Sequence, residues 1–148
     1  MSTKIETATY DSSIDNARAP SSPMLKSVAE LAGRILIAGL FLLSGVGKIT
    51  AYTATAGYMA SMGVPGGMLP LVIAIEVLGS LAIMLGWNTR IVSFLMAGFT
   101  LMTGVLFHSN FADQMQMIMF MKNVSIAGAF LLLTVNGAGP LSLDGKSR

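Results

Sequence analysis

Four long apolar stretches follow one another along this chain, with short polar segments between them. They cover approximately residues 28–47, 69–87, 91–107 and 115–135. A helix needs roughly 17–25 apolar residues to cross the hydrocarbon core of a bilayer, and each stretch is close to that length. The pattern therefore predicts an all-α fold, a bundle of four transmembrane helices.

The link between the first and second stretches, residues 49–67, differs from the other links because it is long. It is too polar to span a membrane, yet Tyr52, Tyr58, Met59 and Met62 fall near one face of a helix. Tyrosines favour the headgroup level of a bilayer. We predict a short interfacial helix here, with an ordinary loop as the alternative, and a glycine- and proline-rich run that ends it.

The first 27 residues have a different composition from the rest. They are rich in Ser and Thr, carry mixed charge, and lack the apolar region of a signal peptide. A segment this polar cannot bury itself. The expected organisation is a disordered cytoplasmic tail over 1–27 and a membrane domain over 28–148.

The amino-acid composition excludes several kinds of function. The chain of 148 residues is 53% hydrophobic and 11% charged, with a mean hydropathy of +0.71, whereas a soluble domain carries about 25% charged residues. A net charge of +2 without a basic run argues against nucleic-acid binding. The absence of cysteine and the single histidine exclude dithiol and iron–sulfur chemistry, and bis-histidine haem within one subunit. No metal site is predicted, so a redox role would need a quinone, an organic cofactor or a partner.

The distribution of basic residues predicts the topology. An even number of spans puts both termini on one side of the membrane. That side, with the turn at 88–90, holds most of the cations: Lys4, Arg18, Lys26, Arg90, Lys146 and Arg148. The other side holds Lys48 and, if its side chain reaches the surface, Lys122. The positive-inside rule then places both termini in the cytoplasm.

This topology brings one ionisable group from each span into the outer half of the bundle. Lys48 ends the first span and His108 ends the third. Glu76 and Lys122 each lie about 10 Å inside the start of their spans, at 1.5 Å per residue. A charge at bilayer depth costs roughly 2.5–3.5 kcal/mol on insertion scales. We therefore expect Glu76 and Lys122 to form an ion pair.

Each of these residues has more than one interpretation. Glu76 and Lys122 could fix the helix register, form a functional polar site, or extend separately to the membrane surface. His108 could be an interfacial residue or a ligand. Arg34 is expected to anchor in the lipid headgroups, with Glu30 one helical turn earlier as its partner.

Several short motifs together resemble the DoxX family, in particular its enterobacterial inner-membrane branch. They cover about residues 28–145: Gly33-Arg34-Ile35-Leu36, Leu43-Ser44-Gly45-Val46-Gly47-Lys48, Gly63-Val64-Pro65, Glu76, Gly86 with Thr89-Arg90, Phe107-His108-Ser109-Asn110-Phe111, Met121-Lys122-Asn123, and Gly137-Ala138-Gly139-Pro140 with Ser142-Leu143-Asp144. The resemblance implies a four-helix protein of the bacterial inner membrane. The family is named for a subunit associated with thiosulfate:quinone oxidoreduction, and relatives are described as oxidoreductases or as partners in membrane redox complexes.

Two functions of different classes follow. In the first, the chain is a quinone-interacting component of a membrane redox complex with a soluble or membrane partner. The candidate catalytic residues are then Glu76, Lys122 and His108, and the candidate cofactor-binding residues are Lys48, His108 and Asn123. In the second, the chain is a non-enzymatic scaffold or assembly protein whose buried charges are structural. A proton or small-solute pathway is a third alternative, and the sequence leaves a homo-oligomer open.

Overall fold

The computed structural model describes residues 22–146, and in that range every regular element is a helix. The elements in chain order are α2 (Pro23–Thr50), α3 (Tyr52–Ser61), the short 3-10 helix η1 (Gly66–Met68), α4 (Leu69–Leu85), α5 (Thr89–Phe107), α6 (Gln114–Asn136) and α7 (Leu143–Lys146). The all-α class is confirmed. Most of the expected tail, residues 1–21, lies outside the described residues.

The four expected spans are confirmed. Pro23–Thr50, Gly66–Leu85, Thr89–Phe107 and Gln114–Asn136 are each long and apolar enough to cross a membrane. The predicted helix between the first two spans is α3. It is ten residues long, and the single residue Ala51 separates it from α2.

Helix α2 begins at Pro23, within the stretch 1–27 that the composition sets apart from the rest. The hydroxyl oxygen of Ser22 accepts a hydrogen bond from the backbone N–H of Leu25 at 3.3 Å. Proline fits the first helical turn, where its missing N–H has no intrahelical acceptor to lose. Together the cap and the proline start the helix in a segment that hydropathy alone reads as polar.

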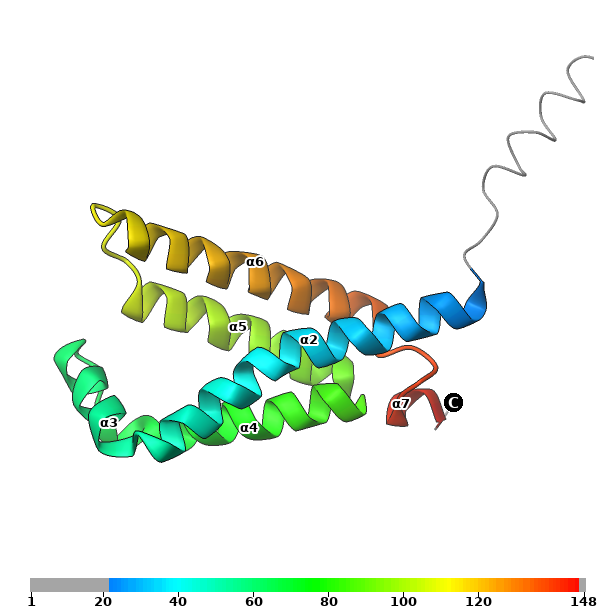
Figure 1. Cartoon of the computed structure of the whole chain (residues 1–148), viewed down its shortest axis with the longest axis horizontal. Coiled ribbons are helices and arrows are strands. Elements are labelled where there is room, and N and C mark those ends of the chain that lie inside the picture. Colours follow the sequence, from blue (N-terminus) through cyan, green and yellow to red (C-terminus); the bar gives the residue numbers. More distant parts are fainter. Residues whose placement is uncertain (1–21, 147–148) are drawn as a thin grey trace, which may run out of the picture.

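The spanning helices form two antiparallel pairs. Helix α2 packs against α4, and α5 packs against α6, with a smaller contact between α4 and α5. The pairs lie close together where the described chain begins and ends, and they spread apart toward α3 (Figure 1). We call these the terminal end and the α3 end. The buried core between the pairs consists of Ala38, Phe41, Ile83, Met96, Ala97, Phe99, Ala127 and Phe130.

Helices α2 and α4 approach each other closely because Gly45 has no side chain. A Cβ atom at Gly45 would lie 2.8 Å from Cγ2 of Val77 and 3.2 Å from Cβ of Glu76, which is closer than side-chain carbons pack. The residues of α2 on either side of Gly45 are therefore within reach of Glu76.

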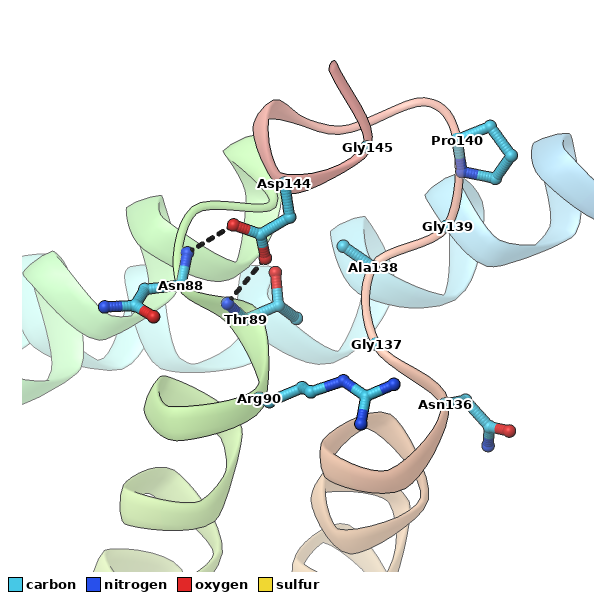
Figure 2. A pocket seen from close by; sticks show the side chains of 10 residues that line it. All are labelled: Asn88, Thr89, Arg90, Asn136, Gly137, Ala138, Gly139, Pro140, Asp144 and Gly145. Carbon is cyan, nitrogen blue, oxygen red and sulfur yellow. Dashed lines mark hydrogen bonds between the residues drawn. The ribbon is translucent and has the colours of Figure 1, made fainter. Parts of the chain in front are cut away.

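The C-terminal residues 137–146, here called the C-terminal strap, fold back on the turn between α4 and α5. Helix α5 has no side-chain cap of its own, since Asn88 makes none. Instead the carboxylate of Asp144 accepts hydrogen bonds from the backbone N–H groups of Asn88 and Thr89, both at 2.8 Å (Figure 2). The backbone N–H of Asp144 donates to the carbonyl of Gly86 at 2.9 Å. A residue far along the chain thus supplies the N-terminal cap of α5.

The expectation that Arg34 anchors in lipid headgroups was wrong. Its side chain is 1% exposed. The guanidinium donates hydrogen bonds to the carbonyls of Ile83 and Met84, both at 3.2 Å, and to the carbonyl of Leu141 in the strap. The last carbonyls of a helix have no partner within the helix, so a buried arginine beside them satisfies groups that lipid could not. Arg34 therefore joins the end of α4 to the strap.

Candidate functional site

A cavity of about 420 Å³ lies between the two helix pairs toward the α3 end. Side chains from α2 to α6 line it, together with His108 directly after α5: Leu40, Phe41, Ser44, Lys48, Thr55, Tyr58, Met59, Val72, Glu76, Phe99, Thr103, Phe107, His108, Met119, Lys122, Asn123 and Ile126. All the candidate residues inferred from the sequence line this one cavity. The structure therefore places them together, as the predicted topology required.

The ion pair in this cavity joins Glu76 to Lys48, and the expected pair with Lys122 is not formed. Both carboxylate oxygens of Glu76 lie 2.9 Å from Nζ of Lys48. The hydroxyl of Ser44 lies 2.6 Å from the same Nζ and donates to Oε1 of Glu76 at 3.3 Å. The pair is therefore a three-residue network, in which the carboxylate is almost fully buried and the ammonium is partly exposed.

Helix packing explains why Lys48 is the partner. Lys48 follows Ser44 by one helical turn, so both side chains lie on the face of α2 that Gly45 brings against α4. Glu76 lies on the facing side of α4. Lys122 is on α6, which packs against α5 and not against α4. Counting residues from the start of each span predicts similar depths for Glu76 and Lys122, but it could not say which helix lies next to α4.

Lys122 remains an unpaired cation at the edge of the cavity. Within residues 22–146 no carboxylate lies within 4.0 Å of its Nζ. Its nearest polar contact is the thioether sulfur of Met119, at 3.8 Å. Because Lys48 already neutralises Glu76, Lys122 gives the lining of this cavity a surplus positive charge when His108 is neutral.

The other two candidate residues are held by contacts at the α3 end. Nδ1 of His108 lies 2.8 Å from Oε1 of Gln116, which fixes the ring and makes Nδ1 the donor in that bond. In neutral His108 the second ring nitrogen is then an acceptor. The side-chain amide of Asn123 donates to the carbonyl of Met119 at 3.2 Å, which leaves its oxygen available.

Sequence reasoning missed three side chains of the site. Ser44 precedes Lys48 by four residues, a spacing from which the contact could have been inferred. Gln116 follows His108 by eight residues across a turn, and no local pattern marks it. Tyr58 stacks on Phe107, with ring centroids 5.8 Å apart and an interplanar angle of 24°. That contact joins α3 to α5, which only the fold reveals.

The lining favours a flat or elongated amphiphilic ligand. Most of the wall is apolar surface from aliphatic, aromatic and methionine side chains, and polar side chains from several helices interrupt it. Within residues 22–146 no group of three or more His, Asp or Glu side chains is close enough to hold a metal ion. The site offers an ammonium, an imidazole and an amide to the oxygen atoms of a ligand.

A second cavity of about 520 Å³ lies at the terminal end, beside the strap (Figure 2). Arg90 extends toward Gly137 in this cavity, and the carboxylate of Asp144 points to the start of α5. Asp144 is occupied by its two backbone hydrogen bonds. We therefore place the candidate site in the cavity of Glu76 and Lys122.

Four apolar helices around an internal polar cluster define a small multi-pass membrane protein. The model of the DoxX family matches residues 29–109. The chain is 53% identical over 120 residues to the inner membrane protein YqjF of Escherichia coli (strain K12), covering 81% of this chain and 92% of that protein. It is 41% identical over 126 residues to the inner membrane protein YphA of the same organism, covering 80% of this chain and 90% of that protein. The chain belongs to the DoxX family. No solved structure matches it.

Proposed function

We propose that this DoxX-family protein binds a quinone in the cavity of Glu76 and Lys122 and serves as a quinone-interacting component of a membrane redox complex. The observation that carries the proposal is a mostly apolar cavity whose lining includes an ammonium without a carboxylate partner among residues 22–146, that of Lys122. A quinone has the matching chemistry, because its ring and tail are apolar and its carbonyl oxygens accept hydrogen bonds.

In this proposal the polar residues divide into two groups. Lys48, Ser44 and Glu76 satisfy one another and form one wall. Lys122, His108 and the amide oxygen of Asn123 have capacity left for a ligand. We infer that Lys122 and His108 contact the quinone oxygens. Since the chain contains no cysteine, electrons would reach the quinone from a soluble or membrane partner.

The test begins with the intact protein purified in mild detergent. Mass spectrometry of a solvent extract should find quinone, and calorimetry should detect binding of a short-tailed ubiquinone. Lys122→Gln should weaken that binding about tenfold to a hundredfold, since a hydrogen bond from a charged group contributes roughly 1.5–3 kcal/mol. Lys26→Gln is the matched control, because Lys26 is a cation of α2 outside the cavity, paired with Glu30. An extract without quinone, together with no binding of added ubiquinone, would contradict the proposal.

One observation favours the alternative, a non-enzymatic scaffold. The Lys48–Glu76–Ser44 network is complete without a ligand, as expected of a purely structural pair. Under the scaffold hypothesis, a Lys48→Met/Glu76→Leu double variant folds and supports its cellular partners as well as the original chain. Replacing a buried ion pair by apolar residues of similar volume is often neutral for stability. Loss of quinone binding in a folded double variant would argue for the redox role.

We further propose that the protein lies in the inner (plasma) membrane of a bacterium, with both termini in the cytoplasm. The names of the two relatives support the membrane. The excess of basic residues at the terminal end supports the orientation. In that orientation the cavity opens in the outer half of the bundle.

A further inference from the structure

Two aromatic contacts bound the cavity, and each joins α2 or α3 to the pair formed by α5 and α6. Toward the terminal end, Phe41 of α2 meets Phe130 of α6 with ring centroids 5.4 Å apart. Toward the α3 end, Tyr58 of α3 stacks on Phe107 of α5 at 5.8 Å. The first contact forms a floor inside the bundle and the second forms part of a roof at the membrane surface. Between them the two pairs are apart enough to leave the cavity.

The surfaces where α2 faces α6, here called the α2–α6 seam, are loosely packed. A third cavity of about 340 Å³ lies below the Phe41–Phe130 contact and is lined by the same two helices and the residue after α6. Its walls include Gly33, Ile37 and Leu133. Cavities therefore lie on both sides of the Phe41–Phe130 contact. Helices α2 and α4, in contrast, meet so closely that Gly45 has no room for a methyl group.

The water-facing side of the cavity is covered by α3. Thr55, Tyr58 and Met59 of this helix all line the cavity, and Met59 is 3% exposed. The 3-10 helix η1 packs closely on the back of α3, since a Cβ atom at Gly66 would lie 2.9 Å from the carbonyl oxygen of Ala56. A polar molecule in water would have to displace this helix to reach the site.

The seam side is different, because its edges face the bilayer. Leu40 of α2 lines the cavity and is 52% exposed. Lys122 of α6 also lines the cavity and is exposed. In a spanning helix such exposed positions contact lipid, so the cavity and the hydrocarbon core meet along this edge.

We propose that the ligand enters the cavity sideways from the bilayer, through the α2–α6 seam, while α3 closes the site to water. This inference rests on the proposed function in taking the cavity as the binding site, and it names the ligand class: a membrane-dissolved amphiphile with an oxygen-bearing head. Its head passes Lys122 on entry, so the unpaired ammonium selects for molecules that can accept a hydrogen bond. Water-soluble molecules of the same size are excluded.

Cysteine labelling tests the route directly, because the chain has no cysteine of its own. Thr103 lines the cavity and is half-buried, so Thr103→Cys places one thiol inside it. The variant is reconstituted in lipid nanodiscs, which leave both membrane faces open to water. A pyrene maleimide dissolved in the lipid and a sulfonated maleimide in the water are compared. Each rate is divided by that of N-ethylmaleimide, which enters both phases, so that the reactivity of the thiol itself cancels.

The expected result is that the lipid-dissolved reagent labels position 103 at least tenfold faster than the water-soluble one. Ser61→Cys is the aqueous control, because Ser61 is exposed on α3 and does not line the cavity. Ala97→Cys is the buried control, since Ala97 is 2% exposed in the core, and neither large reagent should label it quickly. Equal or faster labelling of position 103 by the water-soluble reagent overturns the inference.

Two further variants identify the route. Leu40→Trp fills the seam and should slow the lipid-dissolved reagent at position 103, whereas Tyr58→Ala opens the roof and should speed the water-soluble one. Tyr52→Ala is the control for the second variant, because Tyr52 lies on α3 but does not line the cavity. An unchanged rate in the Leu40→Trp variant excludes the seam. None of these rates depends on quinone, so a protein that binds no quinone but labels as expected would contradict the proposed function alone.

Discussion

A charged side chain inside a membrane needs a partner, and Lys48 and Glu76 provide each other with one. Each carboxylate oxygen is 2.9 Å from the ammonium, and Ser44 supplies a further polar contact. An isolated charge at this depth would be costly, and the paired geometry offsets much of that cost. Arg34 is accommodated by neutral partners, because its guanidinium donates to two carbonyls at the end of α4 and to one in the strap.

Breaking the ion pair from one side should destabilise the bundle. We expect Glu76→Gln to lower the free energy of unfolding by roughly 3–5 kcal/mol, because it leaves the ammonium of Lys48 without a countercharge. The Lys48→Met/Glu76→Leu double variant should recover most of that loss. Unfolding in mixed detergent micelles measures both. A double variant as unstable as Glu76→Gln would show that the pair is not the source of the effect.

The Arg34→Lys substitution should loosen the strap even though the charge is kept. A single ammonium lacks the fork that reaches the end of α4 and the strap together. The expected loss is about 2–3 kcal/mol, the contribution of hydrogen bonds from a charged donor. Thermal melting and limited proteolysis of residues 137–146 provide the measurement. Arg90→Lys is the control, since Arg90 is exposed at the same end of the bundle. If residues 137–146 are cleaved as fast in the Arg90→Lys variant as in the Arg34→Lys variant, the role assigned to Arg34 is contradicted.

At the scale of elements, the close contact of α2 with α4 sets the geometry of the site. It depends on Gly45, where any side chain would collide with Val77. The looser contact of α2 with α6 leaves the cavities on either side of Phe41 and Phe130. The tightly packed helices α2 and α4 carry the ion pair, and the loosely packed helices α2 and α6 leave space for a ligand.

A methyl group on Gly45 should separate these helices. We expect Gly45→Ala to lower the melting temperature by several degrees, since overpacking costs about 1–3 kcal/mol. Gly47→Ala is the matched control, because nothing lies within 4 Å of a Cβ at that position. It should leave stability unchanged or raise it slightly through helix propensity. Equal melting temperatures for the two variants would argue against the close contact.

At the scale of the whole molecule, the two ends of the bundle are packed differently. The strap, Arg34 and Asp144 hold the terminal end together. The two helix pairs spread apart toward the α3 end (Figure 1), where the cavity lies. Among the described residues Lys26, Arg34, Arg90 and Lys146 lie at the terminal end, and this distribution supports the proposed orientation.

The orientation can be tested in cells with single cysteines. We expect a thiol at Lys146→Cys to react with an impermeant maleimide only after the membrane is opened, because the proposed orientation puts the terminal end in the cytoplasm. A thiol at Ser61→Cys, on α3, should react in cells whose inner membrane is intact. The reverse pattern would invert the topology and place the cavity in the inner half of the membrane.

The sequence by itself determined the four spans and the helix between the first two, and it predicts a depth for each charged residue. These follow from local facts, since a bilayer admits only segments of sufficient length and apolarity, and the rise of a helix converts residue number into depth. The sequence also suggested the membership in the DoxX family that the comparisons establish.

Only the tertiary structure decided which charges meet. Residue counting predicted Lys122 as the partner of Glu76, whereas the packing of α2 on α4 places Lys48 there. The burial of Arg34 depends on carbonyls 49, 50 and 107 residues away in the chain. No local pattern encodes a partner at that separation, because the free energy of such a contact exists only once the helices have packed.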